Sequence, residues 1–364
     1  MANFTSVFDD VTKLGKKIPT SEYLKNGKYP IIDQGQSDIA GYTDEESGIF
    51  VNVPAVIFGD HTRIIKYVDV PFFIGADGVK ILKAKDEKAN YKFLYYALSS
   101  AKIPNTGYNR HFKWLKEIDI PTYSEQEQIE IVDELDKIYD LIALRKKQLN
   151  NLDELVKSRF IEMFGSERNK IPIRDMCNVS GGYSFKSSDI SNDGTIKVLQ
   201  IGNVYLDNVS WETTNYLPER FDEKYSKFML NEGDIVVALT RPIIQSLGNV
   251  KACIVKSTDL PCLLNQRVGR IVAKIEKSVF LEFIYGCLMT DDFTRYVETC
   301  SIGCSQPNIS TKNIENYLIP NATPEEQKAY VEFKKQTDKL KFEVKQSLEK
   351  LETLKKSLMQ KYFW

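Results

Sequence analysis

The residue types that carry out covalent or metal chemistry are sparse in this sequence of 364 residues. Its two histidines, His61 and His111, are far apart, and neither lies beside a nucleophile pattern. Glu332 and Lys334 form an E-x-K pair like that of some metal-dependent nucleases, but they fall in a helical pattern with no partner carboxylate on a strand. We interpret that pair as part of a solvated helix face, and neither histidine as catalytic or metal-binding.

Cysteine usage and short motifs also argue against catalysis. The six cysteines all follow residue 165 and include no CxxC pair: Cys177, Cys253, Cys262, Cys287, Cys300 and Cys304. We expect reduced, mostly buried thiols, since free cysteine behaves as a small apolar residue, rather than a zinc site or disulfides. The sequence contains no GxGxxG, P-loop or HExxH motif and no Asn/Asp-Pro-Pro-aromatic signature of an amino-methyltransferase. We therefore predict that this chain is not itself an enzyme.

Composition places the chain among ordinary soluble proteins. Hydrophobic residues make up 42% and charged residues 27%, and the formal net charge is −1. The first residues lack the pattern of a signal peptide, and no apolar run approaches the ~18 residues of a membrane span. We expect a cytoplasmic protein with no membrane contact.

Internal repetition fixes the organisation of the chain. Pro121 aligns with Pro320 at an offset of 199, and this alignment runs without a gap to Phe164 and Phe363. Upstream, the copies align in blocks: 26–35 over 193–202, 68–82 over 258–272, and 92–98 over 282–288. The offset changes from block to block, as expected for two related domains whose loops differ in length. The chain is therefore a duplication in the order globular part, helix, globular part, helix.

Each globular part contains short β-branched and aromatic runs bounded by Gly, Asp and Asn. We predict an α+β class: two duplicated mixed α/β domains, each mainly a curved antiparallel sheet with a short helix, near 90–100 and near 280–290. The predicted boundaries are 1–122 for the first domain, 123–165 for the first spacer helix, 166–322 for the second domain and 323–364 for the second spacer helix.

Two long helices are predicted from about 125 to 164 and from about 325 to 363, where Pro and Gly are absent and apolar residues recur every three or four positions. Ser124 and Thr323 are candidate caps, and Pro324 suits a first helical turn. A 40-residue helix is about 60 Å long, well above the average for a globular protein. We expect the two helices to pair as an antiparallel coiled coil, relating the domains by a pseudo-twofold axis.

Several segments carry a family likeness: the two IP-x-x-x-x-x-EQ helices, GDHTRIIKYVDVPFFIGADGVKIL and GYNRHFKWLKEIDIP in the first half, and GDIVVALTRP, LLNQRVGRI and QPNIS in the second. Together they make the chain resemble the specificity subunit of a type I restriction-modification system, over essentially its whole length. The resemblance implies that each globular part is a target recognition domain that reads one half of a bipartite asymmetric DNA site. It also implies that the helices set the spacer between the halves and dock methyltransferase subunits.

The partners implied by this resemblance are double-stranded DNA, two methyltransferase subunits and restriction-translocase subunits. S-adenosylmethionine, ATP and magnesium would belong to those partners, with none bound by this chain. Two alternatives remain at this stage. One is a coiled-coil protein-binding scaffold, which would protect no DNA in a footprint. The other is the specificity part of a DNA methyltransferase or nuclease outside the type I class. Such a protein would methylate or cleave DNA without partner subunits.

Charge is a weak guide to DNA binding here. Residues 1–124 contain 16 basic and 15 acidic side chains, and residues 165–324 contain 17 and 18, whereas DNA-binding domains are usually basic. We expect local patches and partner subunits to supply the attraction to phosphate, so that the isolated chain binds DNA weakly.

Reading bases requires polar and basic side chains at groove depth. The predicted DNA-binding residues of the first domain are Gln34, Gln36, His61, Thr62, Arg63, Tyr108, Arg110, His111 and Lys113. Those of the second are Tyr183, Ser184, Lys186, Thr240, Arg241, Gln245, Gln266, Arg267, Gln306 and Lys312. Any one of them has a solvated or structural role as its alternative. Asn109 and Asn308 are equivalent in the two copies, so we expect them to cap the exit helices rather than read bases.

Overall fold

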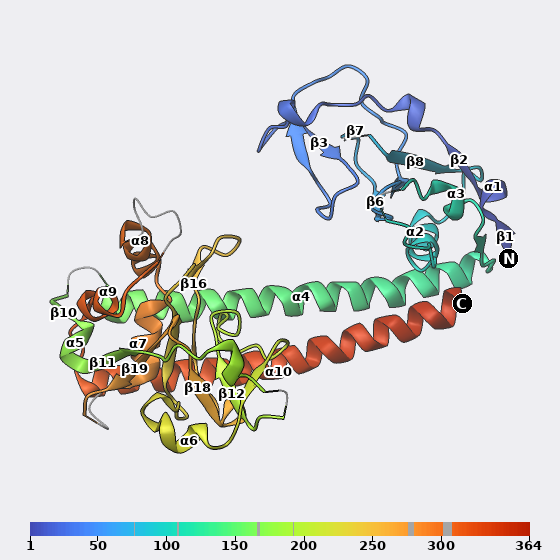
Figure 1. Ribbon diagram of the computed structural model, residues 1–364. Coiled ribbons are helices and arrows are strands. Elements are labelled where there is room, and N and C mark those ends of the chain that lie inside the picture. Colours follow the sequence, from blue (N-terminus) through green and yellow to red (C-terminus); the bar gives the residue numbers. More distant parts are fainter. Residues whose placement is uncertain (76, 108, 166–167, 192, 276–279, 301–307) are drawn as a thin grey trace. The chain divides into compact units, whose positions relative to one another are not determined.

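The computed structural model of this protein describes residues 1–364 except 76, 108, 166–167, 192, 276–279 and 301–307. The chain divides into two compact units, one of Met1–Gln148 with Val344–Trp364 and one of Leu149–Glu343. Each unit holds one globular domain and part of both long helices, α4 (Glu125–Phe164) and α10 (Pro324–Phe363) (Figure 1). Both predicted long helices are thereby confirmed.

The repeated Glu-Gln pair has a structural task at the start of each long helix. Glu127 N donates to Ser124 Oγ at 3.3 Å while the Glu127 carboxylate accepts from Ser124 N at 2.8 Å, which is a capping box. Gln128 Nε2 then donates to the carbonyl of Tyr123 at 3.0 Å. These bonds tie the chain that leaves the domain to the first helical turn.

The second helix begins in the same way. Glu326 N donates to Thr323 Oγ1 at 3.3 Å, the Glu326 carboxylate accepts from Thr323 N at 2.9 Å, and Gln327 Nε2 donates to the Ala322 carbonyl at 2.9 Å. The capping roles predicted for Ser124 and Thr323 are confirmed.

Within each unit the two helices run side by side in opposite directions (Figure 1). In the first unit Arg145 Nε lies 3.2 Å from Ser347 Oγ, and Lys355 Nζ lies over the Tyr139 ring, so residue numbers fall along α10 as they rise along α4. In the second unit the ring of Phe160 meets that of Tyr330 at 5.3 Å. The predicted antiparallel pairing is confirmed in both units.

The first domain is built on two small sheets. A four-stranded antiparallel sheet has the order β2-β8-β5-β6, and a three-stranded sheet has the order β4-β3-β7 with β3 and β7 parallel. A short pair, β1 with β9, closes the domain where the chain leaves for α4. The strands are β1 (Ala2–Asn3), β2 (Phe8–Asp10), β3 (Tyr29–Ile32), β4 (Gly41–Thr43), β5 (Ala55–Gly59), β6 (Ile65–Val68), β7 (Phe73–Ile74), β8 (Val79–Ala84) and β9 (Asp119–Ile120).

The second domain repeats this plan. Its four-stranded sheet has the order β11-β19-β14-β17, its three-stranded sheet the order β13-β12-β18 with β12 and β18 parallel, and β10 with β20 closes the domain. A hairpin of β15 and β16 is added. The strands are β10 (Lys170–Pro172), β11 (Cys177–Gly181), β12 (Ile196–Leu199), β13 (Asn215–Leu217), β14 (Ile235–Ala238), β15 (Ile243–Ile244), β16 (Asn249–Val250), β17 (Ala252–Ile254), β18 (Cys262–Leu264), β19 (Val268–Ala273) and β20 (Leu318–Pro320).

Both predicted short helices are present, as α2 and α7. The α-helices of the first domain are α1 (Phe4–Val7), α2 (Tyr91–Ser99) and α3 (Phe112–Leu115). Those of the second are α5 (Ile173–Met176), α6 (Phe221–Lys224), α7 (Leu281–Leu288), α8 (Asp291–Cys300) and α9 (Thr311–Asn316). Short 3-10 turns are η1 (Thr12–Leu14), η2 (Thr20–Glu22), η3 (Ser187–Asp189), η4 (Ser226–Phe228) and η5 (Ser257–Asp259). The mainly antiparallel sheet is confirmed; the parallel pairs were not predicted, because residue patterns identify strands but not their partners.

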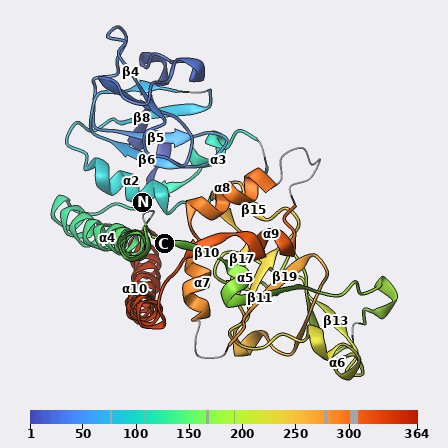
Figure 2. The ribbon, with the colours of Figure 1, turned by 90° about the vertical axis from the view of Figure 1, so that its left-hand side faces the viewer.

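Equivalent aromatic contacts join each domain to its helix pair. In the first unit α2 lies between the sheet and α4 (Figure 2), and Phe93 meets Phe363 with ring centroids 5.5 Å apart. In the second unit Phe283 of α7 meets Phe164 at 4.9 Å. The duplication therefore includes the core that fastens each domain to the helices.

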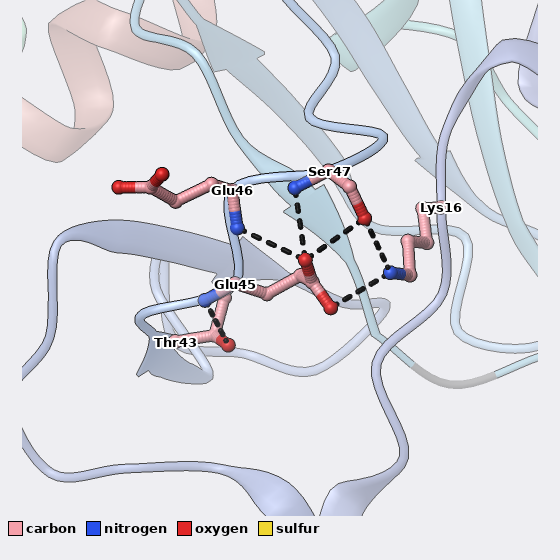
Figure 3. A network of polar contacts seen from close by, with 5 residues as sticks. All are labelled: Lys16, Thr43, Glu45, Glu46 and Ser47. Atoms are coloured by element: carbon pink, nitrogen blue, oxygen red, sulfur yellow. Dashed lines mark hydrogen bonds and ion pairs between the residues drawn. The ribbon is translucent and has the colours of Figure 1, made fainter.

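A polar network closes the turn after β4 in the first domain (Figure 3). Glu45 Oε1 accepts from the amides of Glu46 and Ser47 at 3.0 and 2.8 Å, and Glu45 Oε2 lies 2.8 Å from Lys16 Nζ. The hydrogen bond from Lys16, with those from Ser47, lowers the pKa of Glu45 to about 2.

Candidate functional site

Strand pairing in the second domain brings separate polar loops to one edge of the four-stranded sheet. Ala238, the last residue of β14, pairs with Val268, the first of β19, and Gly181, the last of β11, pairs with Gly269. These strand ends are therefore neighbours. The segments next to them, after β11, after β14 and before β19, lie at the same edge of the sheet. We call residues 183–184, 240–241, 265–267 and 308 the second loop edge.

Backbone hydrogen bonds join these loops into one structure. Gln266 N donates to the Tyr183 carbonyl at 3.0 Å, Leu239 N to the Arg267 carbonyl at 2.9 Å, and Ile309 N to the Leu239 carbonyl at 2.9 Å. Gln266 and Arg267 are exposed, so their side chains face solvent. This edge can present several hydrogen-bond donors to one ligand.

Glycine allows one of these close approaches. A side chain on Gly182 would meet the backbone of Asn265 at 2.5 Å. The Gly181-Gly182 turn therefore lets the strand end pack against the neighbouring loop, and its task is local packing rather than nucleotide binding.

An aromatic group that the sequence analysis missed lies beside the second loop edge. The ring of Tyr183, which is 37% exposed, meets those of Tyr225 at 4.5 Å and Phe228 at 5.5 Å. The spacing of aromatic residues at 221, 225 and 228 was a visible signal, but their partner is about forty residues earlier in the chain. This group supports the loop from which Ser184 and Lys186, both exposed, extend.

The first domain has an equivalent edge, built at the same places in its sheet. Gly59, the last residue of β5, pairs with Val79, the first of β8. Asp60 N donates to the Gly78 carbonyl at 2.7 Å, and His111 N donates to the Asp60 carbonyl at 2.8 Å. We call residues 34–36, 60–63, 77–78 and 110–111 the first loop edge.

The two edges share one unusual turn. Thr62-Arg63 and Thr240-Arg241 both follow the equivalent central strand, and both arginines have a left-handed backbone, with φ of +64° and +48°. A non-glycine residue in this region costs of order 1 kcal/mol and is concentrated at functional sites. Arg241 is exposed, whereas Arg63 is half-buried and donates to the Ile103 carbonyl at 3.3 Å beside a cavity of about 270 Å³.

Gln34 is engaged in contacts inside the first loop edge. Its Nε2 donates to the Asp77 carbonyl at 2.9 Å, its Oε1 accepts from His61 N at 3.1 Å, and its carbonyl accepts from Thr62 Oγ1 at 2.6 Å. The amide that was predicted to read a base therefore joins two loops of the protein. Gln36, two residues later, is exposed.

His111 is the clearest correction to the predicted site. It is 0% exposed, its Nδ1 lies 3.0 Å from the Asp60 carbonyl, and its Nε2 lies 3.3 Å from Thr106 Oγ1. A side chain enclosed in this way has no access to a base edge, so its role is structural. Sequence reasoning missed this because the burial depends on a turn fifty residues away.

The remaining predicted residues lie at the surface or outside the described part of the chain. Exposed side chains are those of Arg110, Lys113, Gln245 and Lys312, while His61 and Thr240 are partly buried. Tyr108 and Gln306 lie outside the described residues. Lys312 is on α9, close to the second loop edge, and Gln245 is in the hairpin of β15 and β16.

Asn109 and Asn308 do not cap helices, so that prediction was wrong. Asn109 Nδ2 donates to the Thr106 carbonyl, and Asn308 pairs with Thr240 across the second loop edge. The cap of α9 is Ser310, whose Oγ accepts from Asn313 N at 3.1 Å. Asn109 and Asn308 each lie two residues before the N-cap of the short helix that follows, which is His111 for α3 and Ser310 for α9.

Side chains of types that can ligate a metal or act as a nucleophile also occur among the described residues. Among them, no group of three or more His, Cys, Asp or Glu side chains could hold a metal ion. Burial raises the pKa of Cys177, Cys253 and Cys262 to about 12, which leaves them as protonated thiols at neutral pH. Five cysteines are free and four of these are buried, as predicted; Cys304 lies outside the described residues.

The E-x-K pair lies on α10, where Glu332 is exposed, as predicted, and Lys334 is partly buried. There Lys334 forms an ion pair with Asp338 at 2.7 Å, one helical turn away. None of the helices in the described ranges combines the length and apolar composition needed to cross a membrane.

Sequence comparison finds a family match that covers most of the chain. Residues 5–154 and 166–355 each match the family described as type I restriction modification DNA specificity domain. The MjaVIII type I restriction enzyme specificity subunit of Methanocaldococcus jannaschii is 32% identical over 317 residues, which cover 79% of this chain and 74% of that protein. The EcoR124I/EcoR124II specificity subunit of Escherichia coli is 23% identical over 350 residues, covering 89% and 82%.

Two solved structures share the fold. The S subunit of a type I restriction-modification system from M. genitalium aligns with a TM-score of 0.60 and 18% identity, covering 100% of this chain and 95% of that one. A chain from a structural study of complex assembly and conformational transition of the type I R-M system aligns with a TM-score of 0.57, 17% identity and the same coverage.

Proposed function

This chain belongs to the type I restriction modification DNA specificity family, and from that membership we infer that it is the DNA sequence-specificity subunit of a type I restriction-modification complex. We propose that its two domains read the two halves of one bipartite, asymmetric site. The observation that carries this proposal is the pair of equivalent loop edges. They share the Thr-Arg turn but present different exposed side chains, such as Gln36 in one and Gln266 with Arg267 in the other.

The chemistry would lie in the partner subunits. We propose that this chain performs no catalytic step, acts in the cytoplasm, and binds neither S-adenosylmethionine, ATP nor magnesium, which would be held by methyltransferase and restriction-translocase subunits. The absence of a candidate metal group among the described residues is compatible with this division. The near-neutral domains also fit a protein whose partners supply much of the attraction to phosphate.

Exposed leucines on the long helices are our candidate docking points for two methyltransferase subunits. Leu141 and Leu354 lie at the same level of the helix pair in the first unit and are 40% and 45% exposed. Their equivalents under the duplication, Leu155 and Leu340, occur in the second unit and are 48% and 51% exposed. Two equivalent pairs of exposed leucines suit two copies of the same partner.

Several polar residues on the long helices bind within the helix pair and are less suited to contact a partner. Arg145 bonds Ser347, Lys146 lies 3.8 Å from Glu352, and Lys355 covers the Tyr139 ring. The leucine pairs are therefore the better candidates for docking.

Methylation mapping tests the proposed function. DNA from cells that express this chain with its methyltransferase partner should carry methylation at one split sequence. Replacing residues 1–122 by the matching segment of a relative should change one half of that sequence and leave the other half unchanged. If both halves changed together, or if no split sequence were methylated, the two-reader proposal would be wrong.

A further inference from the structure

A buried lysine lies beneath the loop that carries Gln36 in the first domain. Lys66 is in the edge strand β6, and its side chain is only 4% exposed. Its Nζ donates to the Ser37 carbonyl at 2.6 Å and lies 3.5 Å from the Asp33 carboxylate. A single ammonium group therefore contacts both ends of the 33–37 segment.

The rest of that loop is held as closely. Asp33 Oδ1 accepts from Gly35 N at 2.8 Å, forming a local turn. A side chain on Gly75 would come within 2.8 Å of Asp33 Cβ, and one on Gly59 within 2.8 Å of Gln34 Cβ. The loop therefore packs directly against the glycine backbone at the ends of β5 and β7. Lys66, in β6, contacts the loop from a third strand.

The fold itself does not require a charge at this position. In the four-stranded sheets, Ile57 pairs with Ile81 and Lys66, and its equivalent Val236 pairs with Arg270 and Cys253. Sheet register thus places the buried, uncharged Cys253 in the second domain where the first has Lys66. Burying an ammonium is costly, and burial indeed lowers the pKa of Lys66, although Asp33 and Asp38 oppose that shift.

The second domain holds the equivalent loop with different chemistry. That loop follows β12, and the side chain of Asn203, 2% exposed, lies inside it. Asn203 Nδ2 donates to the carbonyls of Ser210 and Thr213, both at 2.9 Å, and its Oδ1 accepts from Gln200 N at 2.9 Å. Each domain thus uses one buried polar side chain at this loop, of a different type in each.

From these contacts we infer that Lys66 is a positioning residue, which fixes the 33–37 loop so that the first domain reads its half-site. This inference rests on the proposed function and adds a residue that touches no DNA. The ammonium would preorganise the loop, so that Gln36 is presented in one conformation instead of several. Its loss should relax base discrimination in one half of the site only.

The test uses the full chain with its methyltransferase partner on a DNA library randomised across the mapped site. Lys66→Met retains the apolar length of the side chain, and Lys66→Cys inserts the residue that the second domain has at the equivalent position. Either folded variant should lower discrimination about tenfold, the value of one good base contact, in the half assigned to the first domain. Lys83→Met is the matched control, because Lys83 Nζ also donates to a loop carbonyl, that of Pro54, at 2.7 Å.

Hydrogen exchange of the free chain provides an independent readout. Amides 33–38 should exchange at least about tenfold faster in the Lys66 variants than in wild type or Lys83→Met. Unchanged exchange in a folded variant would overturn the positioning role, and faster exchange with unchanged base preferences would overturn its link to recognition. If the wild-type protein itself selected no split sequence, the proposed function would be wrong. The exchange measurement would still show whether Lys66 holds the 33–37 loop.

Discussion

At the scale of single residues, the Glu45 carboxylate shows how a surface turn depends on ionisation (Figure 3). Its pKa falls from the ordinary 4.5 to about 2, chiefly through the hydrogen bond from Lys16. A carboxylate whose pKa is lowered by folding stabilises the folded protein at any pH above its pKa in the unfolded chain. That stabilisation is lost as the pH falls through its pKa in the folded protein.

We therefore expect Glu45→Gln to lower the melting temperature at neutral pH, and this effect to shrink below about pH 4.5 and to be mostly lost by pH 2. Melting curves of both proteins between pH 7 and pH 2 would measure the difference. Glu46→Gln is the control for the loss of a neighbouring carboxylate, because its side chain points away from this network (Figure 3) and pairs with a different lysine, Lys28, at 2.5 Å. A difference that persisted unchanged at pH 2 would contradict the assignment.

Arg267 is the residue of the second loop edge whose role we can test most directly. It is exposed just before β19, and Asn265 Oδ1 accepts from its backbone amide at 3.2 Å. Arg267→Ala should cost about 1–3 kcal/mol of discrimination at one base if the guanidinium reads that base. Methylation rates on single-base variants of the mapped site would measure this.

A matched control exists at the other end of the same strand. Lys274 is exposed just after β19, so Lys274→Ala removes a similar charge away from the second loop edge. Equal effects of the two substitutions would show that Arg267 contributes only general charge.

At the scale of elements, the long helices combine a buried seam with the exposed leucine pairs. Leu135 is 0% exposed in the first unit, whereas Leu141, nearly two turns later, is 40% exposed. An exposed leucine contributes little to folding, so its replacement changes mainly what the surface can bind.

Introducing charge at one leucine pair should therefore remove one partner. Leu141→Asp with Leu354→Asp is expected to leave a complex with a single methyltransferase subunit, because the pair in the second unit is intact. Native mass spectrometry would give the subunit count, and Leu155→Asp with Leu340→Asp should give the same result. A complex that kept both partners would rule out these leucines as docking points.

At the scale of the whole molecule, the helices are proposed to set the spacing between half-sites. Seven residues inserted after Arg145 and seven more before Ser347 should keep these paired positions in register, since two turns of a coiled coil take seven residues. The helices would lengthen by about 10 Å, which corresponds to about three base pairs.

The mapped site should then contain a spacer longer by about that amount, with both half-sequences unchanged. Insertion into α4 alone is the control and should lower the melting temperature, because it shifts one helix against the other. An unchanged spacer in the doubly extended protein would show that the helices do not measure it.

The amino-acid sequence alone determined the duplication, the α+β class, both long helices and their caps. These features depend on residues close together in the chain: the 199-residue offset is exact over the helices, and Ser124 and Glu127 are three positions apart. Local hydrogen bonds and apolar periodicity need no knowledge of distant contacts, so pattern was sufficient.

Only the tertiary structure decided which polar residues meet at each loop edge. It assigned Gln34 and His111 to internal contacts, left Gln266 and Arg267 at the surface, and placed Lys66 beneath a loop about thirty residues earlier. The physical reason is that strand pairing and burial join segments far apart in the chain. The same side chain can bind a neighbouring carbonyl or face solvent, and its residue type does not distinguish the two.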